Sequence, residues 1–322
     1  MNAAMKLGTY VLGLAAVFGG TVGVGNILGD PTGSPADTAA RQSGDGGTSP
    51  TPTAIAETQE VPGGLQISQD GYTLVPRTTT LSPGKRTDFR FTVAGPDGRP
   101  VTRYTPLHGK KLHFIVVRRD MTGFQHLHPV EAGGGVWSVP LTLPAAGAYR
   151  VFTDVRPAGE PEQLTLGMDL AAPGDYQPEA LPAAERSARV DDDYTVTVAG
   201  SLVPGKTGKL TLSVREDGRP VTDLQPYLEA YGHLVVLRAG DLAYLHVHPE
   251  GAPGDGTTDP GPDITFSAAV PSAGAYRLYL DFQHEETVRT AEFTMTAGGP
   301  AEVAPAPAEP AEPSGHDESH GH

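Results

Sequence analysis

The sequence contains no cysteine among its 322 residues. That absence excludes disulfide bonds, thiolate metal sites and cysteine nucleophiles. Any metal ion held by this chain must therefore be bound by histidine, carboxylate, methionine or backbone ligands. Positive charge is also scarce, because 23 Lys and Arg residues face 38 Asp and Glu residues and leave a formal net charge of −15. An acidic chain without a basic stripe repels nucleic acid, so we expect no nucleic-acid partner.

Motifs of hydrolytic enzymes are missing as well. The sequence has neither the GxSxG turn of serine hydrolases nor the HExxH motif of zinc proteases. A metal ion on three histidines with an open position could hydrolyse a substrate in principle. Residues 251–262, however, form the only insertion that could build a pocket. We therefore expect a binding or structural protein and not an enzyme.

Long apolar runs are absent except for one at the N-terminus. Residues 7–28 carry no charge, and a run of 22 residues is long enough to cross a bilayer as a helix. Lys6 precedes the run and Asp30 follows it, which favours an N-terminus inside the cell. We expect residues 1–30 to be an uncleaved transmembrane anchor at the cell membrane, with the bulk of the chain outside the cytoplasm. The rival interpretation is a cleaved signal peptide, which would leave a secreted protein.

Two segments have the composition of flexible tethers. Residues 31–64 and 298–322 are rich in small residues and proline, so we expect both to be disordered. The second segment ends in HDESHGH, which resembles the mobile histidine-rich tails of metal-handling proteins. The plainer interpretation of that ending is a solvated polar tail.

Between these tethers the chain repeats itself. Each copy consists of short alternating strands separated by turn residues, which is the pattern of a β-sandwich. The GAYR segments at 147–150 and 274–277 resemble the tyrosine corner of immunoglobulin-like domains. We therefore predict an all-β protein of two tandem immunoglobulin-like β-sandwich repeats, residues 65–178 and 187–297, after an N-terminal transmembrane helix. The clearest repeated sequences are DGRPVT (97–102 and 217–222), HLHP and HVHP (126–129 and 246–249), and PAAGAYRVFTD and PSAGAYRLYLD (144–154 and 271–281).

A strand–turn–strand segment in each copy carries three histidines, namely His113, His126 and His128 in the first copy and His233, His246 and His248 in the second. In the first copy, a turn centred on Asp120–Met121 pairs Ile115 with His126. The same register pairs His113 with His128. Side chains alternate along a strand, so the three imidazoles then share one face of the sheet. The first copy therefore predicts a cluster of three imidazoles. The second copy repeats the pattern, although its turn at Arg238–Asp241 is open to another register.

One aspartate completes each predicted cluster. The strand after the tyrosine corner should run antiparallel beside the first histidine strand, which places Asp154 near His113. Asp281 should likewise lie near His233, and His284 follows in the next loop. Three imidazoles and a carboxylate suit Zn²⁺, Cu²⁺ or Ni²⁺, and the Irving–Williams order favours copper over zinc. The alternative is that these histidines are buried, hydrogen-bonded and inert.

The histidine-bearing strands are apolar on both faces, since they read HFIVV from His113 and HLVVL from His233. A sheet that is buried on both faces needs cover. We hypothesise that the two repeats pack sheet to sheet and bring both histidine clusters to one interdomain seam.

The segment GHLVVLRAGDLAYLHVHP (232–249) resembles actinobacterial secreted or membrane-anchored proteins with paired GHxVVxR…YxHxHP repeats, which are associated with heavy-metal handling. The resemblance covers both repeats and implies the same six strand histidines as ligands. A weaker likeness, of fold alone, is to CopC-type periplasmic copper carriers. We expect an extracytoplasmic, membrane-anchored protein that binds Cu²⁺ or Zn²⁺ for buffering, delivery or sensing, and a metal transporter or an oxidase would be a fitting partner. The alternative is a structural or adhesive exported protein whose histidines are structural.

Overall fold

The computed structural model describes residues 62–245 and 247–298. The predicted anchor of residues 1–30 lies outside these ranges, as do most of the linker 31–64 and nearly all of the tail 298–322. Every element of regular structure in the described ranges is a β-strand, so the predicted all-β fold is confirmed there. Those ranges contain no helix that is long and apolar enough to cross a membrane.

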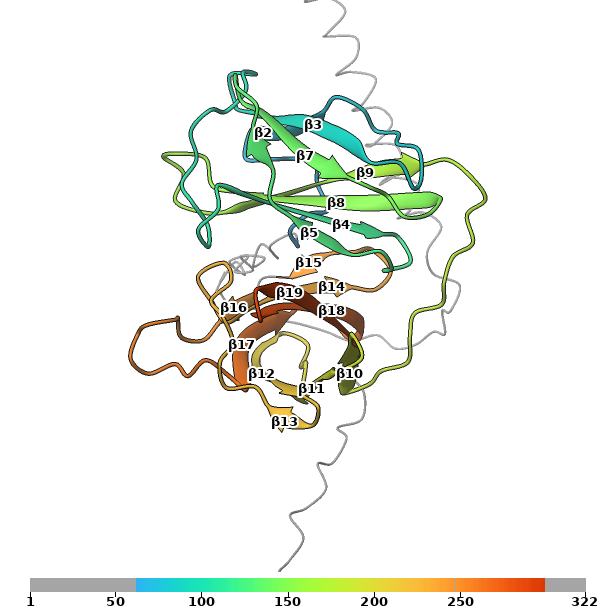
Figure 1. The fold of residues 1–322 in the computed structure, drawn as a ribbon. Coiled ribbons are helices and arrows are strands. Elements are labelled where there is room, and N and C mark those ends of the chain that lie inside the picture. Colours follow the sequence, from blue (N-terminus) through green and yellow to red (C-terminus); the bar gives the residue numbers. More distant parts are fainter. Residues whose placement is uncertain (1–61, 246, 299–322) are drawn as a thin grey trace, which may run out of the picture. The chain divides into compact units, whose positions relative to one another are not determined.

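The first repeat is a sandwich of two antiparallel sheets (Figure 1). Its strands are β1 (Ser68–Gln69), β2 (Tyr72–Pro76), β3 (Thr87–Ala94), β4 (Leu112–Arg118), β5 (Gln125–Leu127), β6 (Val130–Glu131), β7 (Val136–Leu141), β8 (Gly147–Val155) and β9 (Leu164–Ala172). One sheet has the order β1-β2-β3-β7-β6, and the facing sheet has the order β5-β4-β8-β9.

The second repeat has the same architecture. Its strands are β10 (Ser187–Val190), β11 (Tyr194–Gly200), β12 (Lys206–Glu216), β13 (Arg219–Pro220), β14 (Gly232–Arg238), β15 (Tyr244–Leu245), β16 (Val247–Pro249), β17 (Asp263–Val270), β18 (Gly274–His284) and β19 (Thr287–Ala297). One sheet has the order β10-β11-β12-β17-β16, with β13 also paired to β12, and the other has the order β15-β14-β18-β19.

Strand alternation builds the core of each sandwich. In β3, Phe89 and Phe91 are fully buried, whereas Arg90 between them is exposed. Successive side chains of a strand point to opposite faces, so a period of two in the sequence separates the core from the solvent. Met168 and Met295, which occupy matching positions in the two copies, are also buried in their own cores.

Both predicted tyrosine corners are present. Tyr149 donates its hydroxyl to the Ala145 carbonyl at 2.9 Å, and Tyr276 donates to the Ser272 carbonyl at 2.7 Å. In immunoglobulin-like sandwiches such a bond ties the start of a strand to the loop before it. Both rings are fully buried, so their role in the fold is structural.

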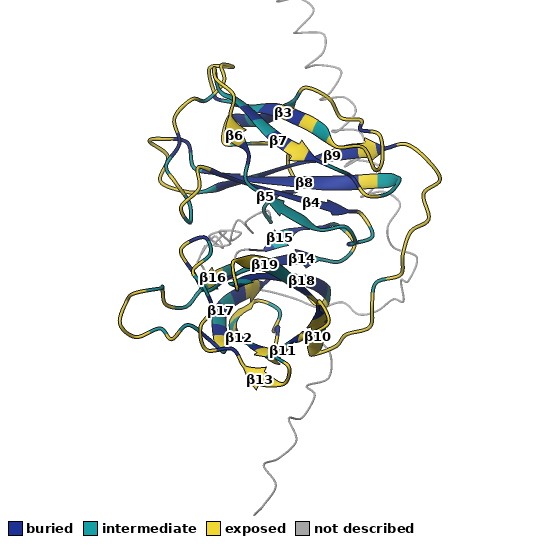
Figure 2. Cartoon of the chain, in the orientation of Figure 1, coloured by how far each residue is buried: buried dark blue, intermediate teal, exposed yellow. Residues whose placement is uncertain are grey.

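Strands β4 and β14 are buried on both faces, as the apolar sequence runs predicted. One face of each strand contributes to the core of its own sandwich. On the other face, Ile115 and Val117 of β4 join Val235 and Leu237 of β14 in a single apolar cluster. The two sandwiches therefore pack sheet to sheet, within one compact unit, along an interface that we call the seam. Figure 2 shows β4 and most of β8 as buried.

The seam relates the two repeats by an approximate two-fold symmetry. Phe124 stacks on Tyr279 with ring centroids 4.0 Å apart. Tyr244 packs against Phe152 at 5.4 Å. Phe124 and Tyr244 occupy equivalent positions in the two copies, and so do the two rings that they contact. Each repeat therefore offers the same surface to the other.

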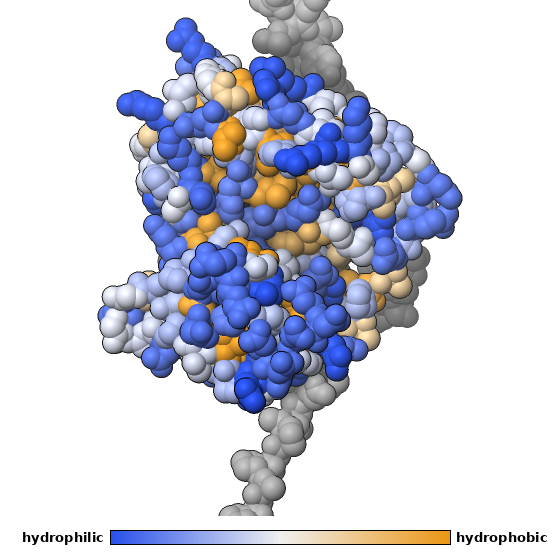
Figure 3. Space-filling model, in the orientation of Figure 1, coloured by the Kyte–Doolittle hydropathy of each residue, from blue (hydrophilic) through white to orange (hydrophobic). Residues whose placement is uncertain are grey.

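The outer surface is mainly hydrophilic. Figure 3 shows blue residues over most of the face drawn, with orange residues in small groups. Few large apolar side chains in the described ranges are exposed, and the most exposed of them is Val130. The apolar seam faces of the two histidine-bearing sheets are therefore covered by each other and not presented to solvent.

Candidate metal centre

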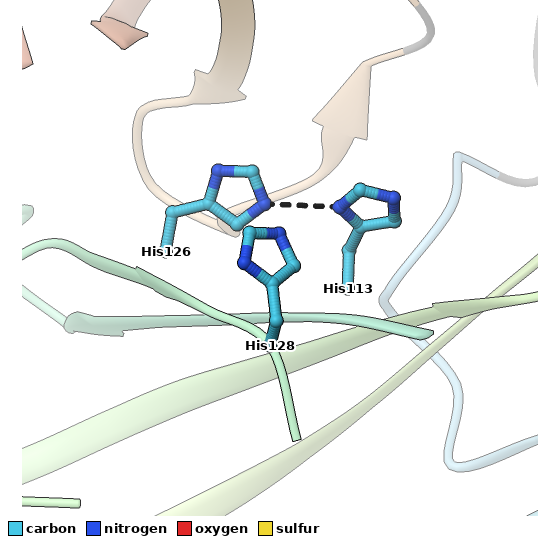
Figure 4. A group of neighbouring side chains, drawn as sticks. All are labelled: His113, His126 and His128. Carbon is cyan, nitrogen blue, oxygen red and sulfur yellow. Dashed lines mark hydrogen bonds between the residues drawn. The ribbon is translucent and has the colours of Figure 1, made fainter. Parts of the chain in front are cut away.

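Three histidines of the first repeat meet in the seam. His113 lies on β4 and His126 on β5, and the predicted pairing of Ile115 with His126 is confirmed. His128 follows β5 directly. Because His113 is two residues from Ile115, its side chain leaves the same face of the sheet. Figure 4 shows the three rings pointing toward one another.

The ring nitrogens of these histidines are close enough to share one ion. His113 Nδ1 lies 3.1 Å from His126 Nε2. One ligand nitrogen from each of the three rings can be chosen so that all lie within 4.8 Å of one another. In the described part of the chain, the buried Nε2 of His128 has no hydrogen-bond partner. Buried polar atoms without a hydrogen-bond partner are rare in folded proteins, so this nitrogen is a candidate metal ligand.

The outer ring nitrogens define the tautomers. His113 Nε2 lies 2.8 Å from the carbonyl oxygen of Leu107, so this nitrogen must carry the proton that it donates. His126 Nδ1 lies 2.8 Å from Oδ2 of Asp281 and must be a donor for the same reason. In neutral rings, the two nitrogens that face each other at 3.1 Å then both present lone pairs. Opposed lone pairs repel unless a cation lies between them.

A proton bound to His113 or His128 is a poor candidate for that cation. Burial, with a smaller contribution from the neighbouring His126, lowers the pKa of His113 to about 4 and the pKa of His128 to about 3. Burial also holds the pKa of His233 well below its ordinary value. These three rings are therefore neutral near pH 7, and neutral imidazole is the form that binds metal ions.

Asp281 of β18 is only 2% exposed and bonds across the seam. Its backbone pairs with His233, as predicted. Its carboxylate, however, accepts the hydrogen bond from His126 of the first repeat and another from Thr290 Oγ1 at 2.6 Å. Metal-bound histidines usually donate their second ring N–H to a carboxylate or a backbone carbonyl, and Asp281 and Leu107 stand in those two places. Asp281 is thus positioned to orient a ligand.

Asp154 occupies the equivalent position in the first repeat. Its backbone pairs with His113, as predicted, and its carboxylate accepts a hydrogen bond from Thr165 Oγ1 at 2.6 Å. Across the seam it lies beside Tyr244, where burial and then the charge of Asp154 raise the pKa of the tyrosine. Both repeats thus carry a row of histidine, aspartate and threonine on the seam face of three neighbouring strands.

The histidines of the second repeat take different places. His233 joins the cluster of the first repeat, with its ring centroid 4.8 Å from that of His126 and 5.5 Å from that of His113. His248 is exposed, and its backbone pairs with Ser267 on the opposite sheet. His246 lies outside the described residues. Of the second predicted cluster, the described coordinates therefore place only His233 among the imidazoles of the first.

His284 does not lie beside Asp281, and the prediction that grouped them needs correction. The two residues are three positions apart on β18, so their side chains leave opposite faces of the strand. His284 points into the second sandwich, where its Nδ1 lies 2.8 Å from the Tyr194 hydroxyl and its Nε2 lies 3.2 Å from Oδ1 of Asp223. Both ring nitrogens are engaged there, away from the seam.

His108 belongs to the imidazole group and was missed in the sequence. Its ring centroid lies 5.6 Å from that of His233 and 6.1 Å from that of His113. The equivalent residue of the second copy is Leu228. Comparing the histidines that both copies share does not identify His108. Comparing the histidines that only one copy carries would identify it.

The fold and the site together define a class of protein, a tandem all-β sandwich with an imidazole cluster between its repeats. The family described as a domain of unknown function (DUF8832) matches residues 67–171 and again residues 188–299. The chain belongs to this family, and the two matches coincide with the two sandwiches. No curated protein matches the chain.

Several solved structures resemble the chain weakly. They include the adhesin FdeC of Escherichia coli (15% identity, 72% of this chain and 65% of that chain, TM-score 0.23) and InvE, an adhesin of Yersinia pseudotuberculosis (16% identity, 71% and 60%, TM-score 0.21). The bacterial integrin-binding protein invasin is a third (12% identity, 72% and 41%, TM-score 0.21). The chain thus spans less than two thirds of the length of each. Likenesses of this size carry no conclusion about function.

Proposed function

We propose that this protein binds a divalent metal ion in the seam through His113, His126 and His128, with copper favoured over zinc. The observation that carries the proposal is the pair of nitrogens 3.1 Å apart on His113 and His126, whose rings both donate their other N–H to an oxygen acceptor. His128 adds a buried Nε2 that has no partner within residues 62–245 and 247–298. A cation at this point replaces a repulsion with coordinate bonds.

The spacing of the nitrogens fits an imidazole-bound metal. Zn–N bonds of about 2.0–2.1 Å at tetrahedral angles put ligand nitrogens about 3.4 Å apart. The observed 3.1 Å between His113 Nδ1 and His126 Nε2 is close to that value. Imidazole ligands suit zinc, copper and nickel, and copper binds most tightly in a site that does not select by geometry. Three nitrogen ligands leave a fourth coordination position for one further ligand.

The setting proposed for this chemistry is the outer side of a membrane, with residues 1–30 as the anchor. There the protein would buffer, deliver or sense the ion, and a metal transporter or an oxidase would receive it. The formal net charge of −15 raises the local concentration of cations around the protein. Acidification would release the ion, because protons compete for the imidazole nitrogens.

The first experiment measures metal binding by the full chain. The tail residues His316, His320 and His322 are replaced by glutamine so that they contribute nothing, and no metal column is used in purification. Titration with Cu²⁺ and with Zn²⁺, followed by elemental analysis after dialysis, should show bound metal at no more than one or two ions per chain. The melting temperature should rise, because a ligand that binds only the folded state stabilises it.

His126→Ala is the decisive variant, and Gln125→Ala is its matched control. Both residues lie on β5, but Gln125 donates from Nε2 to the Thr142 carbonyl at 3.0 Å and takes no part in the cluster. We expect His126→Ala to lose the seam ion and Gln125→Ala to keep it. Unchanged affinity and stoichiometry in His126→Ala would overturn the proposal.

A structural or adhesive role is the second candidate, and it has an observation of its own. The bond between His126 and Asp281 joins the two repeats, and the two side chains are only 2% and 3% exposed. The same histidines would then hold the two repeats together in an exported sandwich protein, which presents loops such as residues 251–262 to a partner. On this alternative Cu²⁺ and Zn²⁺ leave the melting temperature unchanged, and His126→Ala lowers it equally with and without metal.

A further inference from the structure

We infer that the ion is held by both repeats at once, with His233 of the second repeat as a fourth imidazole beside His113, His126 and His128. This inference rests on the proposed metal function and specifies its architecture. The sequence predicted one metal centre in each repeat, and the inference puts a single centre shared by both repeats in their place. An ion bound in this way clamps the two sandwiches together.

His233 is surrounded by imidazoles of the other repeat. Its ring centroid lies 4.8 Å from that of His126. It lies 5.5 Å from that of His113, with the two ring planes only 5° apart, and 5.6 Å from that of His108. The approximate two-fold symmetry of the seam explains this arrangement, because residues equivalent to His113 and His233 meet where the two sheets face each other. His233 of the second predicted cluster therefore lies at the same place as the first cluster.

One strand pair of the second repeat supplies two parts of the centre. His233 on β14 and Asp281 on β18 are cross-strand neighbours. Asp281 holds the ring of His126 through the 2.8 Å hydrogen bond. Movement of the second repeat away from the first would therefore remove one ligand and the group that orients another. The centre is complete only while the seam is closed.

The clamp follows from linkage. Domains of one chain move relative to one another by default unless their interface is large and hydrophobic. A ligand that binds only the closed form raises the ratio of closed to open molecules by a factor of 1 + [L]/Kd, which is about a hundredfold when the free metal is at a hundred times its Kd. A filled centre thus holds the seam shut, and opening of the seam releases the ion.

His233→Ala tests the fourth ligand in the full chain with the tail histidines replaced. Gln283→Ala is the matched control, because Gln283 lies two positions beyond Asp281 on β18 and bonds Gln225, not the imidazoles. We expect His233→Ala to weaken the affinity for Cu²⁺ by at least about tenfold, the scale of effects around metal-bound histidines. The nitrogen couplings in the Cu²⁺ electron paramagnetic resonance spectrum should fall from those of four imidazoles to those of three. Gln283→Ala should change neither quantity.

The clamp has a separate readout, because the chain has no cysteine and accepts specific spin labels. Val130→Cys in the first repeat and Val288→Cys in the second place labels at exposed positions, 65% and 42% accessible. We expect the distribution of distances between the labels to narrow when Zn²⁺ is added. In the doubly labelled protein that also carries His233→Ala, Zn²⁺ should narrow this distance distribution less.

The outcomes separate the two claims. If His126→Ala keeps the seam ion, the proposed function fails and the shared centre fails with it. If His126→Ala loses the ion but His233→Ala binds Cu²⁺ with the affinity and nitrogen couplings of the parent, the function stands and the shared centre is overturned. A label distribution that does not respond to Zn²⁺ in the parent overturns the clamp.

Discussion

Nδ1 of His126 donates a hydrogen bond to Oδ2 of Asp281 at 2.8 Å, across the seam and across 155 positions of sequence. One residue belongs to the HLHP segment of the first repeat, and the other ends the GAYRLYLD segment of the second. The bond turns the imidazole so that its Nε2 faces His113. Both the metal proposal and the structural alternative depend on this contact.

Asp281→Asn should weaken metal binding while keeping the shape of the side chain. An amide oxygen is a poorer acceptor than a carboxylate and does not balance the charge of an ion, so we expect about a 10–100-fold loss of affinity. Isothermal titration with Cu²⁺ measures the change. Asp263→Asn, at an exposed carboxylate of β17, is the control and should bind like the parent. Equal Cu²⁺ affinities of the two variants would show that Asp281 does not support the metal centre.

Acid should destabilise the metal-free protein. Burial lowers the pKa of His113 to about 4 and that of His128 to about 3, against about 6.5 in an unfolded chain. Above the unfolded value both states hold neutral rings and these groups add no pH dependence. As the pH falls from about 6.5 towards 4, the unfolded chain binds protons that the folded chain does not, so the free energy of unfolding decreases.

Urea unfolding at about pH 7.5 and about pH 5 measures this loss of stability. Combining His113→Gln with His128→Gln should make the difference between the two pH values smaller. A difference as large as that of the parent would show that other groups cause it.

Tyr279→Phe should weaken the seam without touching the imidazoles. The Tyr279 hydroxyl donates to the Met121 carbonyl of the other repeat at 2.7 Å, and the ring is fully buried. Its loss leaves a buried carbonyl without its partner, so we expect the free energy of unfolding to fall by about 1–3 kcal/mol. Tyr176→Phe, at a ring that is 37% exposed, is the control and should change stability little. Equal stabilities of the two variants would contradict this role of the hydroxyl.

Comparing Gly64→Ala with Gly84→Ala measures the cost of a steric clash between residue 64 and the ring of Phe152 at the seam. The two glycines have φ of 72° and 71°, so alanine suffers similar backbone strain at either position. An added Cβ at Gly64 would lie 2.3 Å from Cδ1 of Phe152, whereas at Gly84 it would meet nothing within 4 Å. We expect Gly64→Ala to lose about 1–3 kcal/mol more in urea unfolding. Equal losses of unfolding free energy in the two variants would mean that the Phe152 ring moves aside without an energetic cost.

Local patterns predicted much of the fold. Alternation in β3, the GAYR segments and the internal repeat each indicate a sandwich, because strand period and turn chemistry act over a few residues. The same reasoning placed Ile115 opposite His126 and His113 opposite Asp154, as observed. It even indicated the seam, since a strand that is apolar on both faces must be covered on both.

Local patterns could not say which residues meet across that seam. They assigned His233 and Asp281 to a cluster of their own repeat, but the structure places His233 among rings of the first repeat and bonds Asp281 to His126. The repeat pattern does not indicate His108, because only one copy carries it. It misplaces His284, because β18 continues to this residue and turns its ring into the second sandwich.

The sequence by itself determined the β-sandwich class, the pairings around His113 in the first repeat and the histidines available, because strand period and local pairing are properties of neighbouring residues. Only the tertiary structure decided which imidazoles of the two repeats share one place. That outcome depends on how two sheets pack face to face, and the packing is set by side chains such as Phe124 and Tyr279 that lie far apart in the chain and meet only in the folded molecule.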